Sequence, residues 1–301
     1  MRVAITGVSS VLGFNLALEI LKNRDNLVRA LVRERSSNAI NVLRRYKNFE
    51  LIVGDVKERS SVDSLLEDIE VVYHFAAVSS ERLCLARPEE AISVNVGSTA
   101  LIAERAGKKK VKLIFPSSAA VYQSGYYPKE DSPTTTDRLY GLTKHTAEKV
   151  IRIMADRYGL EYTIFRLSRL YGVGMRRNPI YDIWQGYLRN EPVQLYDDLD
   201  SWYDFIYAED AVRILIAAAG DERFLGLTFN LGSGIATPLR ELLAIAEEVF
   251  GCKFDVKELN NKPSFDVLNV EKLKALGYEA SYLPRAGLTQ MKNLVNEIGF
   301  I

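Results

Sequence analysis

The chain has 301 residues, with 39 Lys and Arg balanced by 39 Asp and Glu, and it is 48% hydrophobic and 26% charged. This composition is typical of a folded globular protein, and the balanced charge predicts no nucleic-acid partner. We expect no membrane partner, because no apolar run is long enough to span one, and no signal peptide opens the chain. Two cysteines fit a cytoplasmic protein without disulfides. With only two histidines, we expect no metal site.

A turn that begins and ends with glycine follows the first short strand. The strand Arg2–Thr6 precedes the run Gly7-Val-Ser-Ser-Val-Leu-Gly13, after which apolar residues recur at helical spacing. Strand, turn and helix in this order form the context in which a dinucleotide pyrophosphate binds at a helix N-terminus. Ser10 occupies the place of the usual middle glycine, so a turn without a ligand is the alternative. The candidate cofactor residues here are Gly7, Ser9, Ser10, Val11, Leu12 and Gly13.

The second strand, Leu27–Val32, lacks at its end the acidic residue that would bind the ribose 2′-hydroxyl of NAD. Arg33 and Ser36 follow instead. A guanidinium suits the 2′-phosphate of NADP, because it can donate two parallel hydrogen bonds to phosphate. We therefore expect NADP as the cofactor, with NAD possible. Glu34 leaves a solvated charged turn as the alternative.

Two further strands, at residues 49–53 and 70–74, end in residues suited to a dinucleotide. An aspartate after the first can accept a hydrogen bond from the adenine amino group. Small residues after the second let the backbone approach a cofactor, although close packing is an alternative. Asn95, on the following helix, could fix a sheet end or a water molecule, or serve helix packing. The residues concerned at the two strand ends are Asp55, Val56, Phe75, Ala76 and Ala77.

The run Tyr140-Gly-Leu-Thr-Lys144 places a tyrosine and a lysine on one face of a helix. A nearby ammonium favours the tyrosinate and lowers the phenol pKa, and the same lysine can bind a ribose hydroxyl. Upstream, the strand at residues 112–115 ends in Pro116-Ser-Ser118, and open parallel sheets place their chemistry at such strand ends. A serine there could hydrogen-bond a substrate oxygen while the tyrosine exchanges its proton. An exposed helix face is the alternative for the Tyr–Lys pair.

Together these motifs resemble the extended short-chain dehydrogenase/reductase family, in its NAD(P)-dependent branch of nucleotide-sugar epimerases and dehydratases, which includes UDP-glucose 4-epimerase. The resemblance implies Ser118, Tyr140 and Lys144 as the catalytic set. It also implies cofactor contacts at Asn95, Pro116, Tyr140, Lys144 and Leu167, and substrate contacts at Ser79, Ser80 and Ser118. The motifs follow in order at Gly7–Gly13, Gly54–Asp55, His74–Ala77, Asn95, Ser117–Tyr122, Tyr140–Lys144, Arg166–Gly172, Trp202–Asp210 and Asn230–Gly234.

The resemblance, with the alternation of strands and helices up to about Arg166, predicts an α/β fold. We expect a doubly wound parallel Rossmann sheet in residues 1–170, which binds the dinucleotide. A smaller C-terminal α/β lobe in residues 171–301 would bind the substrate, and we expect the two to exchange segments.

Departures from the family pattern narrow the reaction. The 4,6-dehydratases carry Asp-Glu after the active hydroxyl, where this chain has Ala119-Ala120. The 3,5-epimerases use a cysteine in the same loop, which this chain lacks. One residue that touches the substrate diphosphate in related epimerases, an asparagine, is replaced by Arg169, and a commonly present arginine is replaced by Tyr203. The arginines that could bind an anionic substrate, or pair with carboxylates of the small lobe, are Arg169, Arg176 and Arg177.

We therefore expect an enzyme of the epimerase type, which acts on a nucleotide-linked sugar by transient hydride transfer at a secondary alcohol. An NADPH-dependent ketone or aldehyde reductase of the same superfamily is the first alternative. A non-catalytic NADP-binding sensor is the second, against which the complete Ser–Tyr–Lys set argues.

Association is also predicted. The helices near residues 89–106 and 140–158 carry apolar residues on more than one face. By resemblance, these helices would pair with those of a second copy as a four-helix bundle and form a homodimer. Burial of both faces within one chain is the alternative.

Overall fold

A computed structural model describes residues 1–34, 37–123, 127–175, 178–195, 198–258 and 263–298. The chain forms two units and passes between them several times. Unit 1 consists of Met1–Gln123, Ser132–Arg166 and Val212–Phe229, and unit 2 consists of Ser124–Asp131, Leu167–Ala211 and Asn230–Ile301. The functions that we assigned to residues 1–170 and 171–301 remain predictions.

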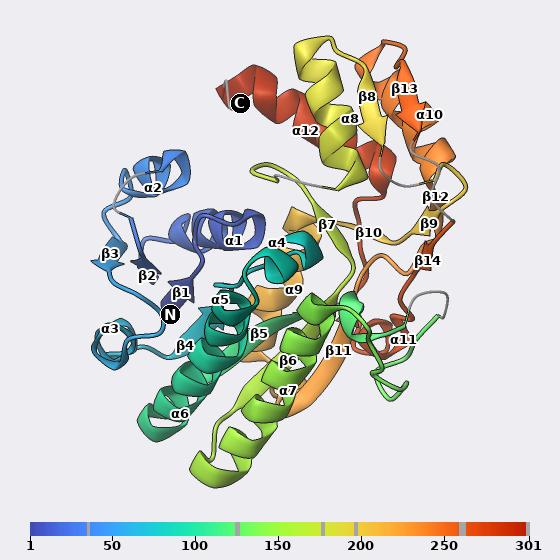
Figure 1. The fold of residues 1–301 in the computed structure, drawn as a ribbon. Helices are drawn as coiled ribbons and strands as arrows, with labels where there is room; N and C mark the ends of the chain where they lie inside the picture. The colour runs from blue at the N-terminus through green and yellow to red at the C-terminus, as the bar shows by residue number, and fades with distance from the viewer. Residues whose placement is uncertain (35–36, 124–126, 176–177, 196–197, 259–262, 299–301) are drawn as a thin grey trace. The chain divides into compact units, whose positions relative to one another are not determined.

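The central sheet has seven strands in the order β11-β6-β5-β4-β1-β2-β3 (Figure 1). Neighbouring strands from β5 to β3 pair in parallel. The chain winds outward in both directions from β1, which confirms the predicted doubly wound fold. The seventh strand comes from beyond residue 170. The strands are β1 (Arg2–Thr6), β2 (Leu27–Val32), β3 (Phe49–Val53), β4 (Val71–His74), β5 (Lys112–Ser118), β6 (Tyr162–Leu167) and β11 (Leu227–Leu231).

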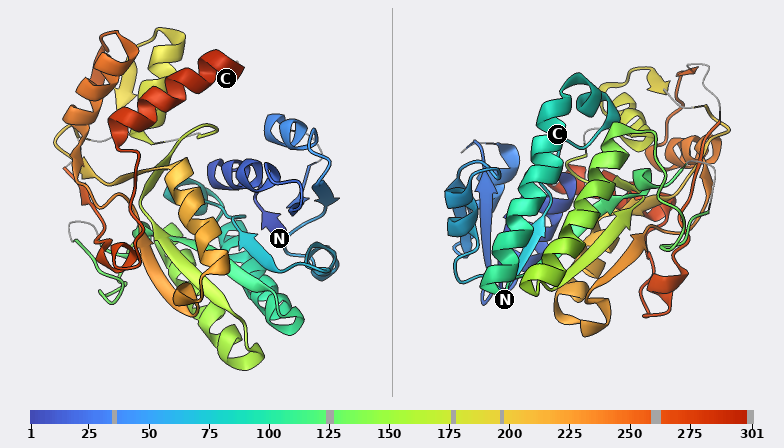
Figure 2. Two further views of the ribbon diagram at one scale, coloured as in Figure 1. Left: turned by 180° about the vertical axis from the view of Figure 1, so that it is seen from behind. Right: turned by 60° about the horizontal axis from the view of Figure 1, so that its bottom comes forward.

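Helices cover both faces of this sheet. Two long helices, α6 and α7, lie side by side on one face, and α1 and α9 lie on the other (Figures 1 and 2). A π-helical segment, η1, precedes α6, and a short 3-10 turn, η2, follows β5. The helices are α1 (Val11–Leu21), α2 (Asn38–Leu43), α3 (Arg59–Leu65), α4 (Glu81–Ala86), α5 (Pro88–Ile92), η1 (Ser93–Ser98), α6 (Thr99–Lys109), η2 (Ala119–Val121), α7 (Leu139–Tyr158), α9 (Ala208–Gly220) and η3 (Glu222–Phe224).

The strands are short apolar runs because both faces of a parallel sheet are buried. In β1, the segment Val3-Ala-Ile5 has no exposed surface. Small residues of α6 and α7, such as Ala103, Ala106 and Ala147, are also completely buried and belong to the same core as Leu113 of β5. This close packing fixes α7 on β5, and both elements carry predicted catalytic residues.

The described residues of unit 2 form short strands and four helices. The ring of Tyr187 stacks on that of Phe250 with centroids 4.4 Å apart, which joins α8 to α10. The buried Asp204 accepts hydrogen bonds from Ser233 N, Ser233 Oγ and Gly234 N, so two of the sequence motifs meet here. The elements are β7 (Arg169–Tyr171), α8 (Pro179–Arg189), β8 (Val193–Leu195), β9 (Trp202–Tyr203), β10 (Phe205–Tyr207), β12 (Thr237–Pro238), α10 (Leu239–Phe250), β13 (Val256–Glu258), β14 (Phe265–Asp266), α11 (Glu271–Lys274) and α12 (Pro284–Ile298). Within the described residues, no helix is both long enough and apolar enough to span a membrane.

Candidate active site

The turn between β1 and α1 requires both of its glycines. Gly7 has a φ of 70°, and a Cβ atom there would lie 2.7 Å from Ala76 N. A Cβ atom on Gly13 would lie 2.4 Å from Gly7 O. Both separations are too short for a real side chain. At Gly7 the turn packs directly on Phe75 and Ala76, which follow β4, and at Gly13 the helix packs on the turn itself. The predicted cofactor residues Gly7, Gly13, Phe75 and Ala76 are therefore neighbours.

The N-terminus of α1 suits a phosphate group. Ser10 caps the helix, because its Oγ accepts a hydrogen bond from Gly13 N at 3.1 Å. No described residue accepts from the amides of Val11 and Leu12, and the first turn holds no acidic residue. Unpaired amides and the positive end of the helix dipole favour an anion. The residues present thus fit the pyrophosphate of a dinucleotide.

The neighbouring strand ends place the other predicted cofactor residues. Ser9 Oγ lies 3.4 Å from the Oγ of Ser37, which caps α2. Arg33 is 73% exposed, and its guanidinium lies 3.7 Å from the carboxylate of Glu90. Ser36 lies outside the described residues. Asp55 Oδ1 accepts from the amide of Lys57 at 2.9 Å, within its own turn. Among the other predicted cofactor contacts, Val56, Phe75 and Leu167 are buried. Ala77 and Pro116 are half-buried.

A chain of buried hydrogen bonds starts at the end of β1. The hydroxyl of Thr6 lies 2.7 Å from His74 Nδ1, and His74 Nε2 lies 3.1 Å from the hydroxyl of Thr99. Thr99 donates its proton to Asn95 O, so His74 Nε2 must donate to Thr99, and Nδ1 must accept from Thr6. Burial, together with the charge of Lys144, lowers the pKa of His74 to about 3. His74 is therefore a neutral imidazole held in one tautomer.

Asn95 continues this chain towards the predicted catalytic helix. Its Oδ1 accepts from Val78 N at 2.7 Å, and its Nδ2 donates to Val78 O at 3.0 Å. Nδ2 also donates to Thr143 Oγ1, which in turn donates to Tyr140 O at 2.8 Å. Asn95 lies in η1, and such π-helical insertions often occur at functional sites. Its side chain thus joins the loop after β4 to the first turn of α7.

Lys144 has an unusual environment for a lysine. Only 4% of its surface is exposed, and its Nζ lies 4.0 Å from the centroid of the Phe115 ring. Burial lowers the pKa of Lys144 to about 7, although the nearby Glu148 carboxylate opposes this shift. No described residue forms a hydrogen bond or ion pair with Nζ. A buried ammonium of this kind fits a hydroxyl-rich ligand such as the ribose of a dinucleotide.

Ser118 ends β5 beside the start of α7. Its Oγ accepts a hydrogen bond from Ala120 N at 3.1 Å, which leaves the hydroxyl proton to donate to a substrate oxygen. Gly141 packs against η2 so closely that a Cβ atom would lie 2.1 Å from Ala120 O. The structure thus brings together the segments that carry Ser118 and Tyr140.

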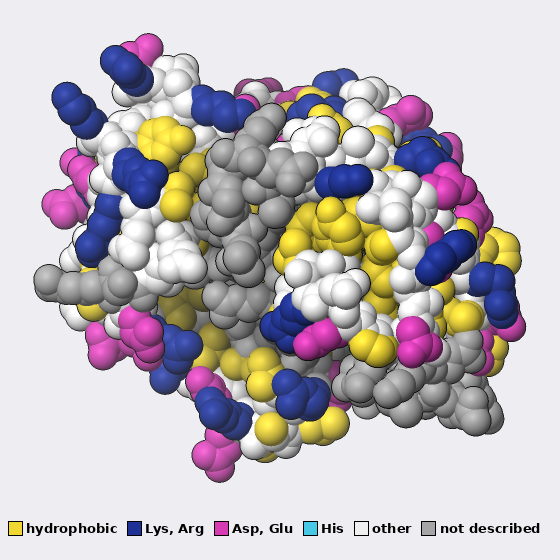
Figure 3. Space-filling view, turned by 90° about the horizontal axis from the view of Figure 1, so that it is seen from above, with side chains coloured by type: hydrophobic (Ala, Val, Ile, Leu, Met, Phe, Trp, Pro, Cys, Tyr) yellow, Lys and Arg dark blue, Asp and Glu magenta, His cyan; other side chains and the backbone are white. Residues whose placement is uncertain are grey.

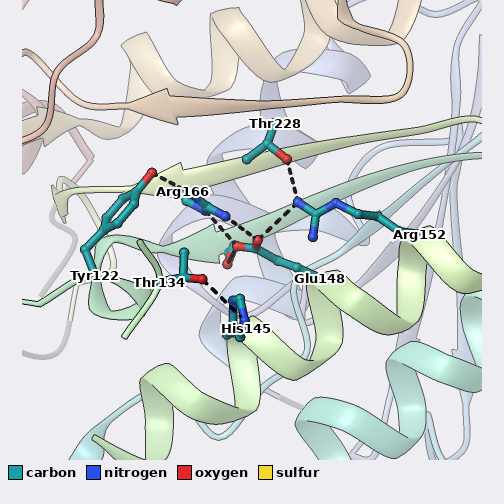
Figure 4. A network of polar contacts seen from close by, with 8 residues as sticks. Tyr122, Thr134, His145, Glu148, Arg152, Arg166 and Thr228 are labelled. Carbon is teal, nitrogen blue, oxygen red and sulfur yellow. Dashed lines mark hydrogen bonds and ion pairs between the residues drawn. The ribbon is translucent and has the colours of Figure 1, made fainter. Parts of the chain in front are cut away.

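A buried ionic network centres on Glu148 of α7 (Figure 4). The carboxylate of Glu148 accepts from Ser117 Oγ at 2.5 Å, and from Arg166 Nε at 3.0 Å and Nη2 at 2.7 Å. Arg166 also donates to the hydroxyl of Tyr122 at 2.7 Å. Arg152 reaches both Glu148 and Thr228 (Figure 4). The network joins the end of β5, α7 and β6, and no part of it was predicted from the sequence.

The predicted substrate residues are spread over both units. In unit 1, Ser79 is exposed and Ser80 caps α4 by accepting from Leu83 N at 3.3 Å. In unit 2, the guanidinium of Arg169 lies 3.7 Å from the centroid of the Tyr203 ring and 3.4 Å from the Asp266 carboxylate. Its Nε is buried without a hydrogen-bond partner among the described residues. The other two predicted arginines, Arg176 and Arg177, lie outside the described residues.

The fold and the glycine turn define a dinucleotide-binding enzyme of the doubly wound class. The chain belongs to the NAD dependent epimerase/dehydratase family, whose model matches residues 3–232. It is 26% identical to a putative UDP-glucose 4-epimerase of Methanocaldococcus jannaschii, over 97% of each chain. It is 29% identical to the UDP-glucose 4-epimerase of Mycoplasma genitalium, over 91% of this chain and 89% of that one.

The fold also matches a solved structure. UDP-glucuronic acid 4-epimerase of Bacillus cereus, in complex with UDP-glucuronic acid and NAD, superimposes with a TM-score of 0.91. The match covers 99% of this chain and 100% of that one, at 22% sequence identity. The family resemblance predicted from the sequence is confirmed, and so is the expectation of an enzyme.

One expectation, the preference for NADP, is changed by these findings. The family is NAD-dependent, and nothing in the comparisons supports NADP as the preferred cofactor. Physically, the exposed Arg33 already faces a carboxylate, which would compete with a 2′-phosphate. On the face shown in Figure 3, charged side chains of both signs are interspersed, in line with the balanced composition.

Proposed function

We propose that this chain is a nucleotide-sugar epimerase that transiently oxidises a secondary alcohol of the sugar, most specifically at C4. One observation carries the proposal: the buried amino group of Lys144 lies one helical turn after Tyr140 and contacts the Phe115 ring, but no described residue forms a hydrogen bond or ion pair with it. The names of the relatives support a substrate of the UDP-glucose type.

Each residue of the predicted catalytic set has a distinct role. Tyr140, as tyrosinate, takes the proton of the sugar hydroxyl and later returns it. Ser118 donates its hydroxyl proton to the same substrate oxygen and holds it in place. Lys144 binds the ribose of the cofactor, and its positive charge favours the tyrosinate. A bound nicotinamide dinucleotide supplies the hydride acceptor and, once the ketone presents its other face, the hydride donor.

Arg169 supports an anionic substrate. Its guanidinium stacks on Tyr203, and Asp266 contacts it at 3.4 Å. Because its buried Nε lacks a described partner, the side chain retains capacity to donate to a diphosphate. We infer that Arg169 and Tyr203 contact the substrate diphosphate in place of the asparagine and arginine of related epimerases.

We propose NAD as the main cofactor and keep NADP as the tested alternative. The ion pair of Arg33 with Glu90 is exposed and therefore weak, so Arg33 could still turn towards a 2′-phosphate. Dissociation constants for both dinucleotides decide this point, in the wild type and in Arg33→Ala. Tighter binding of NADP that is lost in Arg33→Ala would support the alternative. Equal or tighter binding of NAD supports the proposal.

We propose further that the chain forms a homodimer through α6 and α7. Of the apolar residues on these helices, Ile102 and Ile151 are fully buried within the unit, whereas Leu142 and Ile153 are 51% and 59% exposed. The exposed pair leaves part of α7 available to a second copy. A monomer mass in light scattering at micromolar concentration would contradict this association.

The test of the reaction is a panel of UDP-, dTDP- and GDP-sugars, assayed beside neutral ketones and aldehydes. An epimerase interconverts a nucleotide sugar and retains its cofactor, with no net change in reduced dinucleotide. Arg169→Ala should weaken nucleotide-sugar binding, because a charge-assisted hydrogen bond contributes roughly 1.5–3 kcal/mol. Turnover of neutral carbonyls with NADPH, without nucleotide-sugar binding and without an effect of Arg169→Ala, would show a reductase. A sensor would bind the dinucleotide and convert neither class.

A further inference from the structure

The start of α7 is capped by a residue from a different helix. Helix α7 begins at Leu139, and its N-cap residue, Arg138, forms no side-chain capping bond. The carboxylate of Glu81 accepts from Leu139 N at 2.9 Å and from Tyr140 N at 2.8 Å. The first amides of a helix have no partner within it, so Glu81 supplies what the local sequence lacks. One of these two amides belongs to the predicted acid–base residue itself.

The backbone of Tyr140 is held on its other side as well. Its carbonyl accepts from Thr143 Oγ1, which accepts in turn from Asn95 Nδ2. The next residue, Gly141, packs directly on Ala120 O. The peptide groups on either side of the Tyr140 Cα therefore have fixed partners, and the partner of the Tyr140 amide is the charged side chain of Glu81.

The geometry of the contact favours a carboxylate. Leu139 N donates to Oε1 of Glu81 and Tyr140 N donates to Oε2, so each amide has its own oxygen. Glutamine would offer one oxygen, and its NH₂ group would face the second amide. A carboxylate at this point also interacts favourably with the positive end of the α7 dipole. Glu81 opens α4, directly after Ser79 and Ser80, so it ties the loop after β4 to Tyr140.

We propose that Glu81 is a positioning residue, which sets the place of the Tyr140 hydroxyl by fixing the backbone of the first turn of α7. This inference rests on the proposed role of Tyr140 as the acid–base group. A displacement of about 1 Å at a reacting group can reduce the rate by about 10²-fold. Glu81→Gln should thus lower kcat by roughly 10- to 100-fold. The dissociation constant of the dinucleotide should stay within about twofold, because the α1 turn is untouched and Lys144 lies beyond the first turn of α7.

The decisive experiment is a double-mutant cycle with Tyr140→Phe, on any nucleotide sugar that the wild type converts. If Glu81 acts through the Tyr140 hydroxyl, Glu81→Gln loses its effect in the Tyr140→Phe background. Hydrogen exchange measured by mass spectrometry should also show reduced protection of the amides of residues 139 and 140. Glu70→Gln is the matched control, because Glu70 likewise accepts from a backbone amide, Arg2 N at 2.6 Å, at the opposite ends of the strands.

The outcomes separate this inference from the proposed function. Near-wild-type kcat in Glu81→Gln, or losses that multiply in the double variant, would overturn the positioning role. Full turnover in Tyr140→Phe would instead overturn the proposed function, and with it this inference. If Glu81→Gln folds poorly, Glu81→Asp serves in its place. Aspartate keeps both carboxylate oxygens on a side chain that is shorter by one methylene group. We therefore expect Glu81→Asp to cause an intermediate loss of kcat, and we expect no such loss in the Tyr140→Phe background.

Discussion

Removal of the Glu148 carboxylate tests whether the buried ionic network holds unit 1 together. The Glu148 side chain has no exposed surface, and that of Arg166 is 4% exposed. Glu148→Ala would leave Arg166 buried without its carboxylate partner, while the hydroxyl and ring of Tyr122 still contact the guanidinium. Breaking a buried ion pair by removing one member costs about 3–5 kcal/mol, because the remaining charge is uncompensated. We expect the free energy of unfolding to fall by about this amount.

The assay is urea unfolding followed by far-ultraviolet circular dichroism. Tryptophan fluorescence is unsuitable, since both tryptophans, Trp184 and Trp202, belong to unit 2. Glu104→Ala is the control, because its carboxylate lies at the surface with Arg59 and Lys108, and exposed pairs contribute at most about 1 kcal/mol.

A second variant separates the charge from the packing. Glu148→Leu combined with Arg166→Met replaces the pair by apolar groups and should recover most of the loss. A cost below about 1 kcal/mol for Glu148→Ala would contradict this prediction, because it would mean that the charge of Arg166 is compensated without Glu148.

Two further predictions concern the cofactor side of the site. In the unfolded chain His74 takes up a proton near its ordinary pKa of about 6.5. In the folded protein its pKa is lowered to about 3. The free energy of unfolding should therefore fall as the pH decreases below 6.5, by up to about 1.4 kcal/mol per pH unit. Urea unfolding at pH 6.5 and 4.5 should show a smaller decrease in His74→Gln, and equal decreases would contradict a buried neutral imidazole. Gly13→Ala should weaken dinucleotide binding by about 5- to 150-fold, as overpacking of this size costs roughly 1–3 kcal/mol. Calorimetry checks this against Gly220→Ala, where a Cβ atom meets nothing within 4 Å, and unchanged affinity in Gly13→Ala would count against the turn as the cofactor site.

The sequence predicts the parts of the fold that depend on local pattern. The strands of the central sheet are short apolar runs, and the turn from Gly7 to Gly13 has a glycine at each point where a Cβ atom would collide. The doubly wound arrangement was predicted from the family resemblance together with the alternation of strands and helices. The last strand, β11, joins this sheet from far along the chain, and periodicity alone does not reveal its place.

The contacts of the candidate site were less predictable, because they join distant residues. Nothing around Glu81 indicates that its carboxylate reaches a helix 58 residues later. Arg166, a charge within an otherwise apolar strand, was the one available signal for the ionic network. The chain through His74, Asn95 and Thr143 depends on a π-helical segment whose sequence has no distinctive pattern. We expected NADP because Arg33, with a serine nearby, follows the second strand. The sequence around that strand does not indicate that the carboxylate of Glu90 lies beside the Arg33 guanidinium.

The most direct test of the account is the rate at which Tyr140→Phe interconverts a nucleotide sugar and its C4 epimer, followed by nuclear magnetic resonance. The substitution removes the exchanging proton and keeps the ring. General acid–base groups contribute about 10²- to 10⁴-fold, so the rate should fall by this factor while the dinucleotide still binds. Turnover near that of the wild type would contradict the assignment of Tyr140 and the mechanism built on it.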